Sequence, residues 1–242
     1  MHPSWCRQVD ALVSLHFCRM IDLKQDTLFG RRTISTIGFD EQQLIRDILF
    51  LHCNGKPIDC DPTYSVGNFY KHGLPKPRYR FDLKPQCDDV AQASADKLPL
   101  EDATVETMMF DPPFVIGGAT YDESAEGSCI TAKRFTSFTS WEELRQMYEG
   151  SLREAHRVLK PKGVMIFKNQ DTVAGGLNYF SHVWIMNKAV EVGFYPKDLF
   201  ILLAKNRLID GREQEHARKF HCYYWVFEKK ASRVAYSAKM TN

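Results

Sequence analysis

The chain has 242 residues, of which 44% are hydrophobic and 26% are charged. That length can bury one sizeable core but is short for two domains, so we expect a single domain. The formal net charge is only +2, which excludes an overall electrostatic attraction to nucleic acid. Any such attraction has to come from local clusters of basic residues.

Neither secretion nor metal binding is indicated. The seven cysteines are scattered and never form a C-x-x-C pair, so we expect neither a disulfide framework nor a zinc site and assign no metal. The apolar stretch at residues 11–18 contains His16, is followed by Arg19 and lacks a small-residue cleavage site. It is therefore neither a signal peptide nor a membrane span, and we expect a cytoplasmic protein with no membrane partner.

Apolar residues at helical or strand spacing divide the chain into alternating elements. Asp40 with Gln43, and Ser140 with Glu143, have the spacing of capping boxes that begin helices. In chain order we expect a helix from residue 40 to before Asn54-Gly55, strands at 56–60, 78–82 and 104–110, a helix from 140 to 161, a strand at 164–167, a helix ending at Gly193, and strands at 200–204 and 222–227. This alternation predicts an α/β fold with a mostly parallel sheet.

The predicted domain occupies residues 37–230. Apolar residues show no sustained periodicity in residues 1–36, which are expected to form a loosely packed N-terminal extension. Residues 231–242 are expected to form a C-terminal tail. Residues 115–139 form a long, polar, glycine-containing segment. A segment of this kind is either functional or disordered.

A glycine-containing turn follows the first strand, where α/β folds bind ligands at the carboxyl edge of the sheet. Its glycine would let the backbone approach a cofactor closely. Asp82 ends the next strand about 20 residues later, the separation at which an acidic side chain commonly binds ribose hydroxyls, and Asp96 is expected after the following strand. One such aspartate is more often a cap or turn residue, but three above one sheet edge indicate a binding site. The candidate binding residues are Asp61, Pro62, Thr63, Tyr64, Ser65, Gly67, Asp82 and Asp96.

The tetrapeptide Asp111-Pro112-Pro113-Phe114 follows an apolar strand and should emerge at the same edge. Two prolines fix the backbone and remove two N–H donors, so this catalytic turn is rigid and poor in donors. It can present the Asp111 carboxylate and the Pro112 carbonyl as acceptors to one planar amino group, with the Phe114 ring stacked on the base that carries it. A plain Pro-Pro loop is the alternative interpretation of the tetrapeptide.

Three segments together resemble the amino-methyltransferases of DNA, most of all the small single-domain adenine-type enzymes of bacteriophages and prophages. They are Asp61-Pro62-x-x-Ser65-x-Gly67, Asp111-Pro112-Pro113-Phe114 and the run LREAHRVLKPKGVMIFKNQD at residues 152–171. The resemblance extends over residues 37–229. It implies a Rossmann-like methyltransferase fold, with a mostly parallel seven-stranded sheet and helices on both faces.

The resemblance also implies a reaction, methyl transfer from S-adenosyl-L-methionine to adenine N6 in DNA. The segment at 61–67 would bind this cofactor together with Asp82 and Asp96, and the helix after Asp40 would pack over its methionine end. The sequence departs from the family in having Ser65 where many members have a glycine, which leaves the affinity for the cofactor open. It also has no sizeable target-recognition domain, so sequence specificity would be short, loose, or supplied by a specificity partner or a second copy.

Basic and aromatic residues mark the expected contacts with DNA. They are Lys133, Arg134 and Phe135 in the long segment, Lys168 and Gln170 at the end of the strand at 164–167, and Arg218 and Lys219 before the last strand. Phosphate contact is the functional interpretation of the basic residues, although any single one is more often a solvated surface charge. The segment at 133–138 must lie close to a base flipped out beside Phe114.

Two kinds of alternative stay open. The same chemistry could act on cytosine N4 in DNA, on adenine in RNA, or on a glutamine amide of a protein. Families acting on these substrates often replace the leading aspartate of the tetrapeptide, so Asp111 favours adenine modestly. The other alternative is a non-catalytic nucleic-acid-binding subunit with the same fold, against which the intact Asp111 and Gly67 both count.

Overall fold

The computed structural model describes residues 33–116, 138–205 and 215–230. The chain divides into two units, Met1–Ser35 and Thr36–Asn242, and all the helices and strands named here belong to the second. The expected C-terminal tail and nearly all of the expected extension lie outside the described residues.

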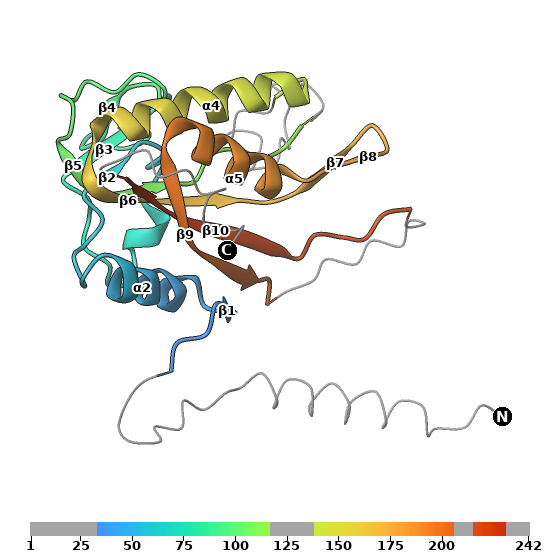
Figure 1. Ribbon diagram of the computed structural model, residues 1–242, viewed down its shortest axis with the longest axis horizontal. Helices are drawn as coiled ribbons and strands as arrows, with labels where there is room; N and C mark the ends of the chain where they lie inside the picture. Colours follow the sequence, from blue (N-terminus) through green and yellow to red (C-terminus); the bar gives the residue numbers. More distant parts are fainter. Residues whose placement is uncertain (1–32, 117–137, 206–214, 231–242) are drawn as a thin grey trace, which may run out of the picture. The chain divides into compact units, whose positions relative to one another are not determined.

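One eight-stranded sheet forms the centre of this unit, with the strand order β1-β9-β10-β6-β5-β2-β3-β4 (Figure 1). Neighbouring strands are parallel except at β10, which runs antiparallel to both β6 and β9. The strands are β1 (Ile37–Gly38), β2 (Cys60–Asp61), β3 (Tyr79–Asp82), β4 (Ala91–Gln92), β5 (Val105–Phe110), β6 (Leu159–Asn169), β9 (Phe194–Leu203) and β10 (His221–Lys229). The predicted α/β class with a mostly parallel sheet is confirmed, and the two-residue β1 adds an eighth strand to the expected seven.

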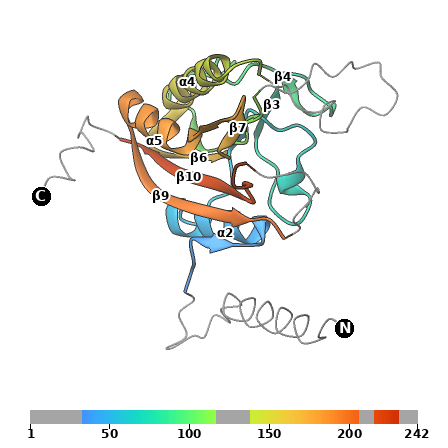
Figure 2. The same ribbon diagram turned by 90° about the vertical axis from the view of Figure 1, so that its right-hand side faces the viewer.

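Helices cover both faces of the sheet. In both views α2 (Glu41–His52) lies on one face, and α4 (Trp141–Val158) with α5 (Ser181–Val192) lies on the other (Figures 1 and 2). Both predicted caps are present, because Asp40 accepts a hydrogen bond from the N–H of Gln43 and Ser140 from that of Glu143. The three helices were all predicted from apolar periodicity, and each buries its apolar stripe against the sheet. No helix in the described ranges is long and apolar enough to cross a membrane.

The strand boundaries differ from the expected ones around prolines and glycines. β2 has only two residues, whereas β6 begins directly after α4 and includes Pro161, Lys162 and Gly163, which were expected to form a loop. An added Cβ at Gly163 would lie 2.8 Å from the Lys160 carbonyl oxygen, so the strand can pass this point only with a glycine. Backbone pairing with β5, whose register shifts here, overrides the local turn signal.

A hairpin that was not expected follows β6. It consists of β7 (Thr172–Ala174) and β8 (Leu177–Tyr179), which form a separate two-stranded sheet. Gly175 and Gly176 at its tip have φ values of 56° and 74°, as the two central residues of a type I′ turn require. The Gly-Gly pair was therefore the available sequence signal for this hairpin.

The fold brings the chemistry-bearing loops to one place. Strands β2, β3, β5 and β6 are mutually parallel along the sheet, so their carboxyl ends share one edge. Asp61, Asp82 and Asp111 lie at the ends of β2, β3 and β5, and Lys168 lies near the end of β6. Fully buried side chains such as Met109, Phe110 and Phe167 anchor the central strands beneath this edge.

The cap of α4 has a measurable effect on stability. Ser140→Ala removes the acceptor for the Glu143 N–H and should lower the free energy of unfolding by about 1 kcal/mol, measured by urea denaturation. Ser140→Asp keeps an acceptor that also suits the helix N-terminus and should preserve stability. Equal losses in the two variants would contradict this role for the side chain.

Candidate active site

The catalytic turn is held at both ends. The backbone N–H of Asp111 donates to Thr63 Oγ1 at 2.9 Å, and the Tyr148 hydroxyl of α4 donates to the Pro113 carbonyl oxygen at 3.3 Å. Pro112 is buried and Phe114 is half-buried. No donor to the Pro112 carbonyl oxygen is found among the described residues. The turn thus keeps the acceptor that the sequence analysis expected to face a ligand.

The Asp111 carboxylate is paired with a lysine from the adjacent strand. Lys168 Nζ lies 3.2 Å from Asp111 Oδ2 and 3.0 Å from Glu41 Oε1. The same Glu41 oxygen accepts a hydrogen bond from the Tyr224 hydroxyl at 2.5 Å. Residues from α2, β6, β10 and the end of β5 therefore form one connected polar cluster.

Burial and charge act in opposite directions in this cluster. Burial raises the pKa of Asp111 above its ordinary value, and the attraction of Lys168 opposes this rise without cancelling it. Burial by itself would lower the pKa of Lys168, but Asp111 and Glu41 outweigh it, so the pKa of this lysine is raised. The lysine consequently stays charged at neutral pH.

Asp61, predicted to contact a cofactor, is fully buried and occupied by protein groups. Its Oδ1 accepts from the Thr63 N–H at 2.9 Å and the Thr63 hydroxyl at 3.2 Å, and its Oδ2 accepts from the Tyr70 hydroxyl at 2.7 Å. Pro62 beside it is also buried. Asp61 and Pro62 therefore support the turn after β2 from within the protein, and neither side chain is exposed.

Gly67 is required by the packing of its own turn. Its φ is 65°, and an added Cβ would lie 2.5 Å from the Tyr64 hydroxyl. The Tyr64 ring stacks on Tyr70 with centroids 5.3 Å apart, so the glycine makes room for the turn's own aromatic packing. Ser65 also has a positive φ, 51°, in a conformation that non-glycine residues seldom adopt.

The two further aspartates differ in their placement. Asp82 Oδ2 accepts from the Ser65 N–H at 2.8 Å, and its Oδ1 accepts from the Lys84 N–H at 2.8 Å. This joins Asp82 to the turn after β2, as expected of one site. Asp96 lies beyond β4 and packs against Gly150 of α4, where an added Cβ would lie 2.9 Å from the Asp96 Cβ.

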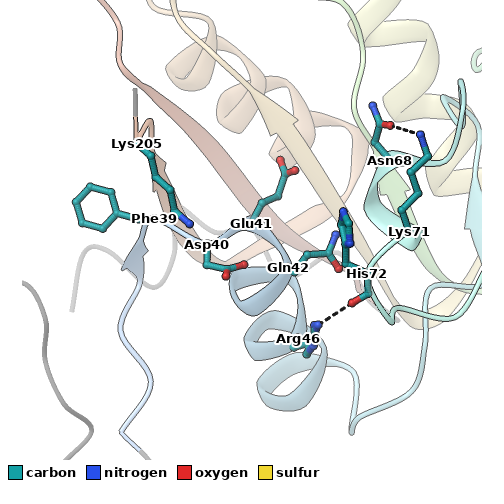
Figure 3. A pocket seen from close by; sticks show the side chains of 9 residues that line it. All are labelled: Phe39, Asp40, Glu41, Gln42, Arg46, Asn68, Lys71, His72 and Lys205. Carbon is teal, nitrogen blue, oxygen red and sulfur yellow. Dashed lines mark hydrogen bonds between the residues drawn. The ribbon is translucent and has the colours of Figure 1, made fainter. Parts of the chain in front are cut away.

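A pocket of about 590 Å³ opens beside the N-terminus of α2, and Figure 3 shows its side chains. Gln42 Nε2 donates to the Phe69 carbonyl oxygen and Arg46 Nη2 to that of His72. The buried atoms Gln42 Oε1 and Arg46 Nη1 have no hydrogen-bond partner within the described part of the chain. Both side chains line the pocket, and each has one buried polar atom without a described partner. It is lined by Phe39, Asp40, Glu41, Gln42, Arg46, Asn68, Lys71, His72 and Lys205.

Sequence reasoning did not identify Glu41, Tyr148 or Tyr224 as parts of the site. Tyr148 and Tyr224 are fully buried and belong to apolar patterns of α4 and β10. The only signal for Glu41 was its position in the first turn of a helix expected to pack over a cofactor. Contacts across the sheet give all three their roles, and a linear pattern cannot show such contacts.

The expected DNA-binding residues are only partly described. Lys133, Arg134 and Phe135 lie outside the described residues, but their segment is flanked by Val115 and Phe138, joined by a backbone hydrogen bond of 3.2 Å. Gln170, expected to line a base pocket, donates to the carbonyl oxygens of Lys219 at 3.2 Å and His221 at 2.7 Å. Its amide nitrogen thus holds the start of β10. Arg218 is exposed and Lys219 half-buried at the same sheet edge.

Comparisons with known proteins show only distant similarity. No family model matches the chain, and no curated protein matches its sequence. Solved structures with a similar arrangement include the cytosine-N4-specific PvuII DNA methyltransferase (14% identity, 58% of this chain and 48% of that one, TM-score 0.43) and TrmN from Thermus thermophilus (18% identity, 78% and 48%, TM-score 0.45). The [4+2]-cyclase SpnF is similar to the same extent (13% identity, 66% and 58%, TM-score 0.41). The chain spans about half the length of the first two proteins. Similarity of this extent does not define a reaction.

Asp61 makes stability depend on pH in a defined direction. Burial raises its pKa to about 7, against the hydrogen bonds from Tyr70 and Thr63, whereas an unfolded aspartate titrates near 4. The contribution of Asp61 to the free energy of unfolding is therefore complete below about pH 4 and is lost as pH rises through about 7. Asp61→Asn stays neutral, so its unfolding free energy should fall less between pH 5 and pH 8 in urea titrations. An unchanged pH dependence would show that Asp61 is already ionised when the protein is folded.

Proposed function

We propose that the protein is an S-adenosyl-L-methionine-dependent methyltransferase acting on an exocyclic amino group of a DNA base, with adenine N6 as the substrate. One observation carries the proposal. The Asp111 carboxylate, on a turn whose Pro112 carbonyl has no donor among the described residues, is linked through Lys168 to Glu41 in the wall of a pocket that carries both acidic and basic side chains. An acceptor pair beside such a pocket suits group transfer to an amine.

The acceptors address the chemical difficulty of this substrate. The lone pair of an exocyclic amine is delocalised into its ring, so the nitrogen is a poor nucleophile. Asp111 and the Pro112 carbonyl would each accept one N–H and favour a tetrahedral, nucleophilic nitrogen, with Phe114 stacking on the base. When bound, S-adenosyl-L-methionine would supply a methyl group whose carbon–sulfur bond breaks with the electron pair remaining on sulfur. The protein's contribution is positioning and fixed dipoles.

The pocket fits the amino-acid end of this cofactor. Arg46 Nη1 would donate to its carboxylate and Gln42 Oε1 would accept from its ammonium group, which would satisfy two buried atoms that have no described partner. Asp40 and Glu41 add negative charge near an ammonium, and Lys71 and Lys205 add positive charge near a carboxylate. The ribose would lie toward Asp82 and the turn after β2.

DNA is the proposed polymer, and its adenine must be flipped out or unpaired to reach Asp111, at a cost of a few kcal/mol. Arg218 and Lys219 lie at the carboxyl edge near Lys168 and would contact phosphate, together with Lys133 and Arg134. Aspartate at the first position of the tetrapeptide favours adenine over cytosine. The recognised sequence would be short, or specificity would be supplied by a partner.

Arg46 should contribute to cofactor binding directly. Arg46→Met removes a charge-assisted hydrogen bond worth about 1.5–3 kcal/mol, so the affinity for S-adenosyl-L-methionine should fall about tenfold or more in calorimetric titration. Arg153→Met, which removes an exposed arginine paired with Glu149 on α4, is the matched control and should bind normally. Unchanged affinity in Arg46→Met would place the cofactor elsewhere.

Labelled cofactor tests the reaction itself. DNA, RNA and the protein alone are incubated with labelled S-adenosyl-L-methionine, and the nucleosides are separated and identified by mass analysis. We expect label in N6-methyladenine from DNA; label in N4-methylcytosine, RNA or protein would overturn the substrate assignment.

Asp111→Ala should lose about a hundredfold or more in single-turnover rate, while Asp102→Ala, at an exposed ion pair with Arg157, should not. A loss below about tenfold, roughly 1.4 kcal/mol, would exclude the catalytic role of Asp111.

A further inference from the structure

Lys168 lies directly beside the Asp111 side chain at the carboxyl edge of the sheet. The last register pair of β5 and β6 is Phe110 with Phe167, so Asp111 and Lys168 are neighbours across the two parallel strands. The Lys168 side chain is only 15% exposed. Its ammonium lies 5.1 Å from the centre of the Phe69 ring and 5.8 Å from that of Tyr224. Carboxylates and aromatic rings together keep this charge away from bulk water.

We propose that Lys168 is a positioning residue for methyl transfer: its ammonium holds Asp111 Oδ2, leaves Oδ1 as the acceptor for the substrate amino group, and joins this carboxylate to Glu41 in the cofactor pocket. The catalytic part of this proposal rests on the proposed function. The contacts themselves, at 3.2 Å to Asp111 and 3.0 Å to Glu41, can be tested without turnover.

The cluster contains two carboxylates for one cation. Without Lys168, Asp111 and Glu41 would share a poorly hydrated site, and the more buried carboxylate would take up a proton more readily. Without the Glu41 charge, Lys168 would pair with Asp111 alone and hold it more firmly in the ionised form. Removing Lys168 should therefore raise the pKa of Asp111, and removing the Glu41 charge should lower it. A purely structural role of Lys168 would not require these opposite shifts.

The protonation of Asp111 should make the rate of methyl transfer depend on pH. Ionised Asp111 is a stronger acceptor for the amino hydrogen than the protonated acid, so the rate should fall as pH drops through the pKa of Asp111, which burial already raises. Each variant compared with the wild-type protein changes only one of the groups that face Asp111. Among the described residues, the titratable groups around it are Glu41 on α2, Asp61 at the end of β2, Tyr148 on α4, Lys168 on β6, and Cys222 and Tyr224 on β10.

Titration of the Asp111 carboxyl by NMR on the full-length protein tests the contact without requiring activity. Lys168→Met should raise the midpoint by about 1 to 3 pH units, the usual influence of a nearby cation on an aspartate, and Glu41→Gln should lower it. Lys188→Met removes a lysine that is also paired with two carboxylates, Glu149 and Glu191, and should leave the midpoint unchanged. An unchanged midpoint in Lys168→Met, or movement of both test variants in the same direction, would overturn the proposal. If Lys168→Met does not fold, Glu41→Gln decides by its direction alone.

The pH profile of the transfer rate provides the second test. In Lys168→Met the acid limb of kcat should move to higher pH, with little change in KM for S-adenosyl-L-methionine, and Lys168→Arg should recover part of the rate by keeping the charge. An acid limb that stays in place would overturn the positioning role. If the wild-type protein methylates no DNA while the Asp111 midpoint moves as expected, the proposed function fails and the hold of Lys168 on Asp111 stands.

Discussion

A lysine ammonium can be buried only with partners that offset its loss of hydration, and the partners of Lys168 organise the whole carboxyl edge. Asp111 comes from the end of β5, Glu41 from the first turn of α2, and Tyr224 from β10. These residues are far apart in the chain. Their convergence on one charge links the face covered by α2 to the turn at residues 111–114, so the pocket beside α2 and the Asp111 carboxylate are connected through one polar cluster.

A second link runs through a single hydroxyl group. Thr63 accepts from the Asp111 N–H and donates to the buried Asp61 carboxylate. The turn after β2 and the turn after β5 therefore form one hydrogen-bonded unit, as expected where adjacent parallel strands end side by side. These bonds fix the two turns relative to each other, which suits chemistry in which two reacting groups must meet at close range.

Several residues expected to contact a ligand also make contacts that hold the loops of the candidate site together. Asp61 is surrounded by donors from its own turn, Gly67 makes room for Tyr64, and the Gln170 amide holds the backbone of β10. Among the described residues, polar groups near the proposed site without a hydrogen-bond partner include the Pro112 carbonyl, Ser65 Oγ, Gln42 Oε1 and Arg46 Nη1. The functional proposal therefore rests on these groups and on Asp111.

The sequence by itself determined the α/β class, the three helices with their caps at Asp40 and Ser140, and the placement of Asp111 at a strand end. These follow from periodicity, capping and proline geometry, which act over a few neighbouring residues. It did not determine the hairpin after β6, the extension of β6 through Pro161, or the roles of Glu41, Tyr148 and Tyr224. Only the tertiary structure decided those, because cross-strand pairing overrides local turn signals, and because an ion pair such as that of Lys168 with Asp111 and Glu41 arises where the fold brings distant residues within a few ångströms.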